Sequence, residues 1–380
     1  MTPAEQQTVS VVIAGIGGYG HYYLKTLLNE FPQGRIRLAG VVDPCAEECA
    51  LYPAICSMNV PVYPDMEQFY EDTPPPHLAL IVSPPHFHLK QSLSALTRQT
   101  SVLCDKPLCP TVDEADAFVK AEQESDAWAM IGYQWSWSRA VLRLKEDIIK
   151  GKYGRPLRAR TICLWPRGFD YYHRNSWAGR IRTDSQEPVF DSPANNAAAH
   201  FLHNLLFLLG DKMDRSARPA TVEAALFRAY PIENFDTISC KIETETGYEI
   251  CFHASHVTEK CMNPCFEIDF SEGRVYFESR SKDITGIDSE NNEIHYGDPD
   301  RDQFGQLCLA IAGAGKEHTP VCGPAAARSQ TETVNIIQNQ ASAISPFPAD
   351  LLDQTDELIR VRSLYERLTA CYKQDRLLTF

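Results

Sequence analysis

The sequence predicts an α/β protein in which a doubly wound parallel sheet is followed by an α+β domain with a mainly antiparallel sheet. Apolar strands alternate with helices from Val9 to Ile131, which is the pattern of parallel strands joined by helical crossovers. From Leu157 to Glu278 strands follow one another without helices, which indicates antiparallel pairing. The 380 residues, 44% of them hydrophobic, suffice for about two domains with full cores.

The first strand leads directly into a glycine-rich turn. Gly15, Gly17 and Gly20 match the pattern G-x-G-x-x-G, and residues 19–29 can form the helix that follows. In this motif the glycines permit a tight turn, close approach of a pyrophosphate and close helix packing, while the helix N-terminus favours an anion. The turn therefore predicts a Rossmann dinucleotide-binding domain over residues 1–134. Its predicted cofactor-binding residues are Gly15, Ile16, Gly17, Gly18, Tyr19 and Gly20.

The second strand, residues 36–42, ends at Asp43. An acid about 20 residues after the glycine motif is placed to accept hydrogen bonds from a ribose, and it repels a 2′-phosphate. Asp43 therefore favours NAD over NADP. The alternative is that Asp43, followed by Pro44, only opens a turn.

Two later strands, residues 78–82 and 101–104, also end in residues suited to a cofactor site. Their carboxyl ends lie at the edge where open α/β sheets bind ligands. The predicted cofactor contacts there are Ser83, Pro84, His88, Asp105 and Lys106. His86 or His88 caps the helix over residues 89–96 or touches the cofactor, and capping is favoured. The other elements predicted in this domain are helices over 65–71 and 112–123 and a strand over 128–131.

A second domain is predicted over residues 135–345, and residues 346–380 are expected to pack back on the body. A helix follows Ser138 and stops at Gly151. Strands are predicted over residues 157–165, 222–230, 237–243, 248–255, 265–270 and 274–278. The tail is predicted to hold one helix near residues 329–341 and an amphipathic helix over 351–372.

The insertion between the first two of these strands carries the most polar and aromatic groups. Asn196, His200 and His203 have the spacing of one helix face, surrounded by apolar residues. A histidine there is more often a satisfied core residue than a functional one, and no carboxylate on this face supports a metal site. The segment before it, residues 170–177, supplies Tyr172, His173, Arg174 and Trp177, which contact substrate or only pack in a loop.

Charge and composition limit the kind of partner. The formal net charge of −14 repels nucleic acid and anionic membranes, and no apolar run approaches the roughly 18 residues of a membrane span. The N-terminus lacks the features of an export signal, which predicts a cytoplasmic protein with reduced thiols in place of disulfides. The 13 cysteines do not form the C-x-x-C pairs of a zinc site. We therefore expect small-molecule partners, other copies of the chain and no metal.

Taken together, these motifs resemble the glucose-fructose oxidoreductase/inositol dehydrogenase/rhizopine catabolism (Gfo/Idh/MocA) family. The resemblance rests on the glycine turn, Asp43, Ser83-Pro-Pro-His-Phe-His88, Asp105-Lys-Pro107, Gly151-Lys-Tyr-Gly-Arg-Pro156 and His200. It implies a Rossmann domain, a second domain whose large open sheet forms a homodimer or homotetramer interface, and NAD(P)-dependent chemistry on sugars, inositols or related polyols. Lys106 corresponds to the lysine of the family's Glu-Lys-Pro motif, and His200 to the histidine of its Asp-x-x-x-His motif.

Two positions depart from the family pattern. Asp105 replaces the usual Glu, and Asn196 stands where the family usually has Asp. An amide can hydrogen-bond a hydroxyl, but it neither accepts a proton nor stabilises an imidazolium by charge.

The leading hypothesis is an NAD-dependent dehydrogenase that acts on a secondary alcohol of a sugar or polyol. His200 is the predicted general base, Lys106 stabilises the developing alkoxide, and Asn196 positions His200 or a hydroxyl. The remaining predicted substrate contacts are Tyr133, Trp135, Asn195 and His203. Two alternatives stay open: an NAD-dependent glycosidase that works by transient oxidation and elimination, and a non-catalytic NAD- or sugar-binding regulator, toward which Asn196 points.

Overall fold

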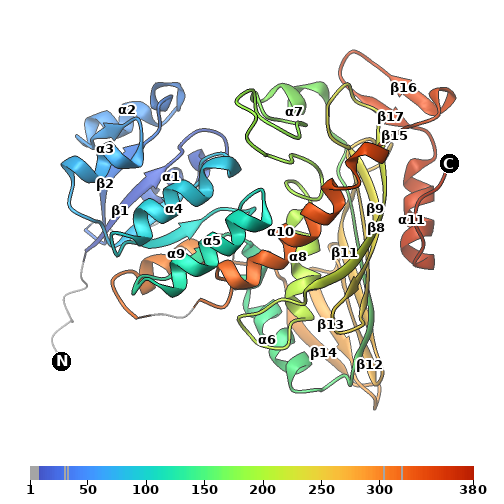
Figure 1. The fold of residues 1–380 in the computed structure, drawn as a ribbon. Helices are drawn as coiled ribbons and strands as arrows, with labels where there is room; N and C mark the ends of the chain where they lie inside the picture. The colour runs from blue at the N-terminus through green and yellow to red at the C-terminus, as the bar shows by residue number, and fades with distance from the viewer. Residues whose placement is uncertain (1–7, 30, 32–33, 303, 318–319) are drawn as a thin grey trace. The chain divides into compact units, whose positions relative to one another are not determined.

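The computed structural model describes residues 8–29, 31, 34–302, 304–317 and 320–380. The chain divides into two compact units, and each is described by itself (Figure 1). The first contains Met1–Cys109, Asp113–Gly132 and Gln303–Pro324, and the second contains Pro110–Val112, Tyr133–Asp302 and Ala325–Phe380. Residues 1–7, on which the prediction about an export signal rests, lie outside the described residues.

The first unit is built on a six-stranded sheet with the order β3-β2-β1-β4-β5-β6 and parallel pairing throughout. This is the Rossmann strand order, so the predicted doubly wound sheet is confirmed. The strands are β1 (Val9–Ala14), β2 (Ile36–Val42), β3 (Val62–Tyr63), β4 (Leu78–Ile81), β5 (Ser101–Cys104) and β6 (Ala129–Ile131). Every residue of β1 is buried, as its run of β-branched side chains predicts.

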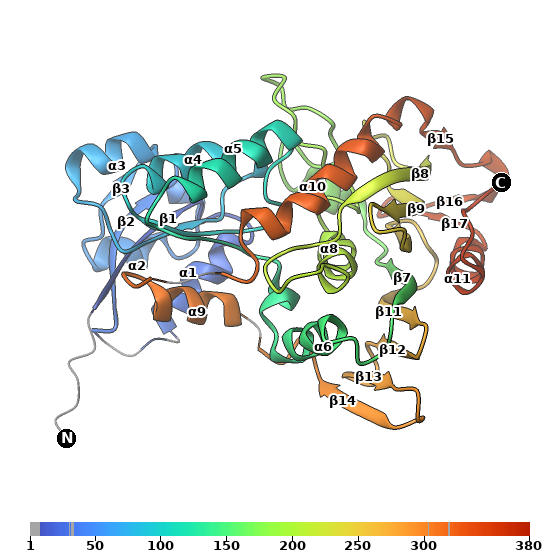
Figure 2. The same cartoon turned by 60° about the horizontal axis from the view of Figure 1, so that its bottom comes forward.

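Helices cover both faces of this sheet. Figure 2 shows α3, α4 and α5 on one face and α1 and α9 on the other. The helices are α1 (Gly20–Asn29), α2 (Tyr52–Ser57), α3 (Met66–Asp72), α4 (His88–Leu96), α5 (Val112–Gln123) and α9 (Gly305–Gly313).

The second unit is built on a nine-stranded sheet with the order β14-β13-β12-β11-β7-β10-β9-β8-β15. Its pairs are antiparallel except for β7 with β10 and β8 with β15, so the predicted mainly antiparallel sheet is confirmed. The strands are β7 (Pro156–Leu164), β8 (Pro219–Arg228), β9 (Thr237–Thr244), β10 (Glu249–Ser255), β11 (Met262–Phe270), β12 (Gly273–Glu278), β13 (Asp283–Ile287), β14 (Glu293–Gly297) and β15 (Ser345–Pro346). The helices are α6 (Arg139–Ile149), α7 (Phe169–His173), α8 (Ala199–Leu208), α10 (Pro324–Gln338) and α11 (Leu364–Gln374).

One segment assigned to the second domain from the sequence belongs to the first unit. Residues 304–317 and 320–324 return to the Rossmann sheet. There the Trp128 indole donates to the carbonyl of Lys316 at 3.3 Å, and Ile131 N donates to the carbonyl of Cys322 at 2.9 Å. The helix α9 in this segment was not predicted. Such a return depends on contacts between residues almost 200 positions apart, which local periodicity does not report.

The C-terminal tail also differs from the prediction. In place of one helix over residues 351–372, a hairpin of β16 (Leu352–Gln354) and β17 (Ile359–Val361) precedes α11. The hydroxyl of Thr355 accepts from the backbone N–H groups of Glu357 and Leu358, which closes the turn of this hairpin. The tail is part of the second unit and not a separate body.

Within the described ranges, no helix has the length and apolar character needed to cross a bilayer. In the same part of the chain, no group of three or more His, Cys, Asp or Glu side chains could hold a metal ion. All 13 cysteines are free thiols.

Candidate active site

The glycine turn is closely packed on one side and open on the other. Gly15 has φ +85°, and a Cβ there would lie 2.6 Å from the backbone nitrogen of Ser83. A Cβ on Gly20, the first residue of α1, would lie 2.2 Å from the carbonyl oxygen of Gly15. At Gly17 and Gly18, by contrast, an added Cβ would meet nothing within 4 Å. The turn thus packs tightly against β4 and α1 and leaves open space at its two central glycines.

Asp43 lies at the end of β2 and holds the glycine turn. One carboxylate oxygen accepts from Ile16 N at 2.9 Å, and the other accepts from Cys45 N at 2.9 Å. Each oxygen has a second lone pair, so the carboxylate can still accept from ribose hydroxyls. The residues therefore fit a dinucleotide: open backbone at Gly17 and Gly18 for a pyrophosphate, and a carboxylate beside them for a ribose.

The rings next to this turn form a cluster that sequence reasoning missed. Tyr19 is 44% exposed and stacks on Phe304 at 6.1 Å, and Tyr23 meets Phe304 edge-on at 5.2 Å. Burial raises the pKa of Tyr19 to about 12, with Asp105 a smaller cause.

His88 is buried and does not cap α4, so the favoured prediction is wrong. The helix begins at His88 itself, and its ring lies between two carbonyl groups: Nδ1 is 2.8 Å from Pro107 O, and Nε2 is 2.8 Å from Ser83 O. Burial lowers the pKa of His88 to about 4. A neutral ring donates to one of these carbonyls only. The His88 ring therefore connects the loop after β4 with the loop after β5. Pro84 lies directly before the short 3-10 helix over Pro85–Phe87.

Asp105 is a buried acid at the end of β5. It accepts from the Tyr23 hydroxyl at 3.2 Å, and that hydroxyl accepts from Gln306 Nε2 at 3.2 Å. Burial raises the pKa of Asp105 to about 6, and the charge of Lys106 opposes this shift. Lys106 itself is half-buried and joined to Pro107 by a cis peptide bond. The sequence did not indicate that Tyr23 lies beside Asp105 or that Gln306 lies beside Tyr23. The second of these contacts depends on the return of the segment that contains Gln306 to the Rossmann sheet.

In the second unit, the predicted catalytic segment is a turn followed by a helix. His200 is half-buried in the first turn of α8, but Asn196 lies in the preceding turn, so the two do not share a helix face. The backbone N–H of Asn196 donates to Ser192 O at 2.9 Å, and the backbone N–H of Ala198 donates to Pro193 O at 2.8 Å. This local bonding places the start of the helix three residues after Asn196.

A buried carboxylate at Asp191 binds Asn196 and was not singled out from the sequence. Asn196 Nδ2 donates to one oxygen of Asp191 at 2.7 Å. The other oxygen accepts from Gly179 N at 2.6 Å and lies 3.4 Å from Nη2 of Arg174. Asp191 is 4% exposed. Because a carboxylate only accepts, this bond fixes Nδ2 of Asn196 toward Asp191 and makes Oδ1 the accepting end of the amide.

His203 lies in the core. The sequence favoured this interpretation of a histidine on an apolar helix over a functional role. It is fully buried, stacks on Tyr133 with ring centres 3.8 Å apart, and has Nε2 3.0 Å from the Ser136 hydroxyl. Burial lowers the pKa of His203 to about 3.

Three other predicted substrate contacts are also interior. The Tyr133 hydroxyl donates to Gln330 at 2.8 Å, and Nε2 of Gln330 donates to Ala194 O at 3.0 Å, next to buried Asn195. The Trp135 indole donates to Asp300 at 2.6 Å. Substrate contact by Tyr133, Trp135 and Asn195 stays a prediction, and their burial favours a supporting role.

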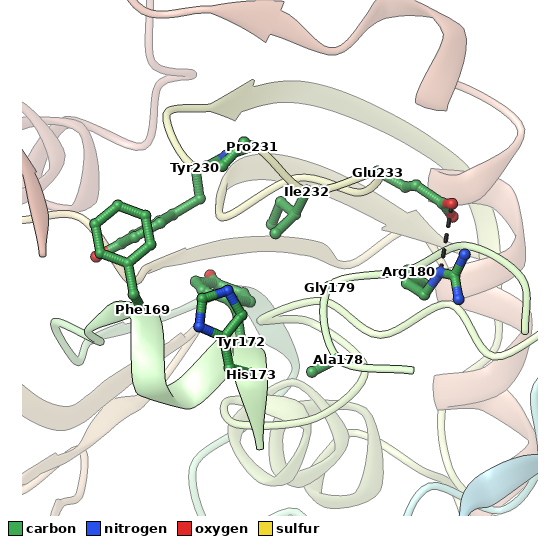
Figure 3. Close-up of a pocket in the computed structure, with 10 residues that line it drawn as sticks. All are labelled: Phe169, Tyr172, His173, Ala178, Gly179, Arg180, Tyr230, Pro231, Ile232 and Glu233. Atoms are coloured by element: carbon green, nitrogen blue, oxygen red, sulfur yellow. Dashed lines mark hydrogen bonds and ion pairs between the residues drawn. The ribbon is translucent and has the colours of Figure 1, made fainter. Parts of the chain in front are cut away.

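Tyr172 and His173 line a pocket of about 250 Å³ (Figure 3). Its lining includes Phe169, Tyr172, His173, Tyr230 and Ile232. The Arg180–Glu233 pair lies at one end, with 3.5 Å between Nε and Oε1. The other lining residues are Ala178, Gly179 and Pro231. Gly179 connects this pocket to the Asn196 turn, because its N–H donates to Asp191. Arg174 lies over the rings of Tyr171 and Trp177, at 3.9 and 5.3 Å.

Comparison with known proteins identifies the first unit. Residues 9–133 match a family model described as an oxidoreductase family with an NAD-binding Rossmann fold. This match confirms the prediction of an NAD-binding domain.

Several relatives are named as sugar or polyol dehydrogenases. An inositol 2-dehydrogenase of Streptomyces avermitilis is 26% identical over 211 residues, 54% of this chain and 55% of the relative. A levoglucosan dehydrogenase of Pseudarthrobacter phenanthrenivorans is 26% identical over 141 residues, 37% of this chain and 35% of the relative. The chain thus spans about half or less of the length of these relatives.

Solved structures share the fold across both units. A levoglucosan dehydrogenase in complex with NADH has a TM-score of 0.70 and 18% identity, over 88% of this chain and 97% of that one. A UDP-N-acetylglucosamine 3-dehydrogenase from Acidithiobacillus ferrooxidans has a TM-score of 0.66 and 17% identity, over 89% and 98%.

Proposed function

We propose, from the premise that this chain belongs to the Gfo/Idh/MocA oxidoreductase family, that it is an NAD-dependent dehydrogenase of a sugar, inositol or related polyol. The observation that carries the proposal is the glycine turn, which is packed shut at Gly15 and Gly20, open at Gly17 and Gly18, and held by the Asp43 carboxylate. The names of the relatives support an alcohol on a sugar or cyclic polyol as the reacting group.

The residues that hold the cofactor in this proposal are those of the turn and Asp43. Ser83 supports the turn, because its backbone lies against Gly15. When bound, the nicotinamide supplies the group that exchanges a hydride with the carbinol carbon. Asp43 favours a free ribose hydroxyl over a 2′-phosphate, so NAD is the expected cofactor.

The chain's own task is to orient the alcohol and to move its proton. His200 accepts the hydroxyl proton as general base, and Lys106 donates a hydrogen bond to the same oxygen as negative charge develops there. For Asn196, the bond to Asp191 supports an accepting role: Oδ1 takes the part that a carboxylate oxygen takes elsewhere in the family. Asp191 supplies the negative charge that Asn196 lacks, one hydrogen bond further away. Asp191 acts through Asn196 and is a positioning residue.

The proposal extends to the substrate segment around α7. Tyr172 and His173 line the pocket in Figure 3, and Arg174 shares the Asp191 carboxylate with Asn196. We expect this segment to set which polyol is accepted, while the chemistry stays with Lys106 and His200.

The test combines binding and turnover. The purified chain is titrated with NAD⁺ and then mixed with myo-inositol, levoglucosan, D-xylose and D-glucose while nicotinamide absorbance is followed. We expect NADH to form with at least one polyol, and Lys106→Ala and His200→Ala to lose turnover, whereas Lys90→Ala, at an exposed lysine of α4, retains it. Unchanged turnover in the first two variants would remove both residues from the mechanism.

The same assays separate the alternatives. Release of nitrophenol from a nitrophenyl glycoside without net NADH identifies the glycosidase. NAD⁺ binding without turnover of any polyol or glycoside identifies the non-catalytic regulator.

A further inference from the structure

The large sheet of the second unit has an apolar patch on one face. We call that face the outer face, and the apolar patch on it consists of Ile162, Leu164 and Phe227. The opposite face carries α8, which packs on β7, and Figure 1 shows α8 and α11 on opposite sides of the sheet. The family resemblance assigns self-association to the open face of this sheet, so what covers the outer face decides whether that assignment can hold.

The chain's own C-terminal residues cover the patch. We call residues 345–380 the C-terminal cap. In α11, Leu364, Leu368 and Cys371 are buried on one side of the helix and belong to one apolar cluster with Ile162 and Leu164. Their spacing of four and three residues is that of a single helix stripe. The cap therefore fills the position that a second subunit would need.

Hydrogen bonds and ring contacts fix the cap at several points along its length. Val361 N donates to Val257 O at 2.8 Å, and Leu378 N donates to the Ser239 hydroxyl at 2.9 Å. Phe347 stacks on Phe227 at 5.2 Å, and β15 pairs with β8 at the edge of the sheet. The cap thus closes both the face and the edge on this side.

Ion pairs connect the C-terminal end of α11 to the outer face of the sheet. Asp375 lies 2.6 Å from Arg158 and 3.2 Å from Arg160, and its side chain is only 12% exposed. Both arginines project from β7, in the middle of the sheet, and their other partners are Asp269 and Glu267 of β11.

The part of the outer face beyond the cap is polar. On β11 to β14 the side chains that share this face include Glu267, Asp269, Arg274, Glu278, Asp283 and His295. Several are already paired within the face, as His295 is with Asp283 at 2.5 Å. Stable homomeric interfaces are more apolar than this at their centre and are depleted in charge.

We infer that the C-terminal cap occupies in cis the face through which this sheet would otherwise associate, so that the chain does not form an oligomer through the sheet. The only occupant of the apolar patch is then the chain's own residues 345–380, and a second copy can reach the patch only when the cap is displaced. This inference is independent of the proposed activity.

The test measures mass and amide exchange on the full chain. Light scattering after size exclusion is expected to give a mass near the monomer value of 42.7 kDa. Tyr276, which pairs with Glu267, and His295 lie on the uncovered part of the outer face, and Tyr276→Arg or His295→Glu is expected to leave this mass unchanged. Amide hydrogens of α11 are expected to exchange at the slow rate of a buried helix.

Two variants in α11 make the test specific to the cap. Leu368→Asp places a charge in the apolar cluster, and it is expected to speed exchange in α11 and to cause concentration-dependent association. Lys373→Asp changes an exposed position of the same helix and is expected to do neither. Slow amide exchange in β7 and β10, which pair in the middle of the same sheet, reports whether the second unit of Leu368→Asp remains folded. Leu368→Ala serves as a milder variant if it does not.

The outcomes are decisive in each case. A dimer or tetramer that Tyr276→Arg or His295→Glu dissociates overturns the inference, and so does fast exchange of α11 in the unmodified chain. A mass near 42.7 kDa together with slow exchange of α11 supports the inference.

Discussion

The Asp191–Asn196 pair gives the sharpest prediction, because the two residues differ by one group and are joined by one hydrogen bond. Asp191→Asn keeps the size of the side chain and replaces one accepting oxygen by a donating nitrogen. Three N–H donors, from Gly179 at 2.6 Å, Asn196 at 2.7 Å and Arg174 at 3.4 Å, then face a side chain with only one accepting oxygen. At a site 4% exposed, water does not replace the lost partner.

The cost of a buried donor without an acceptor is about 1–3 kcal/mol. If this cost falls on the orientation of Asn196, kcat/KM decreases roughly 5- to 150-fold. Asn196→Asp alone places two carboxylates at hydrogen-bond distance, which is also unfavourable at neutral pH. In the double variant Asp191→Asn/Asn196→Asp, the amide and the carboxylate exchange places and one donor again meets one acceptor. We therefore expect the double variant to recover most of the activity lost by either single variant.

The assay is steady-state oxidation of the polyol identified by the screen, with NAD⁺ affinity measured separately. Asp184→Asn, at an exposed acid paired with Arg180, is the control and should be neutral. Two single-variant losses that simply add in the double variant would refute the reasoning, because additivity means that the two side chains are not coupled.

Three further predictions concern the cofactor site and pH. Asp43→Ser should narrow the preference for NAD over NADP, read as the ratio of the two dissociation constants; an unchanged ratio would leave Asp43 with only its role in the turn. Gly17→Ala should weaken NAD⁺ binding with little change in Tm, whereas Gly20→Ala should lower Tm, since only the second Cβ meets backbone, at 2.2 Å; equal effects on Tm would contradict the open-cradle geometry. His253 pairs with Ile162 and so lies on the outer face, where it is fully buried, and burial lowers its pKa to about 3. Because the unfolded chain binds that proton near pH 6.5, acidification from about pH 6.5 to 5 should cost about 2 kcal/mol of stability through this residue, and His253→Leu should flatten the pH dependence of urea unfolding.

Much of the first unit could be predicted from the sequence because its signals are local. The β-branched run of β1, the three glycines and the acid at the end of β2 each lie within a short window, and the structure places Asp43 and Ser83 against the same turn. The strand succession of the second sheet was likewise visible, because each strand is an apolar run between turn residues.

Features that depend on distant contacts could not be predicted. The segment after residue 303 carries no mark of its return to the Rossmann sheet, so Gln306 beside Tyr23 was missed. The apolar spacing in the tail fits a long helix, but the Thr355 turn and the bond from Val361 to Val257 make its first half a hairpin. A carboxylate five residues before Asn196 was visible in the sequence, whereas its burial and its hydrogen bond to the amide were not.

The most direct test of the central claim is the isotope content of the nicotinamide after turnover of a polyol deuterated at its carbinol carbon. The account predicts that each NADH formed carries one deuterium, transferred from the carbon whose hydroxyl proton His200 accepts, and that His200→Ala slows this transfer without weakening NAD⁺ binding. NADH without deuterium, or bound NAD⁺ that no polyol reduces, would contradict the account.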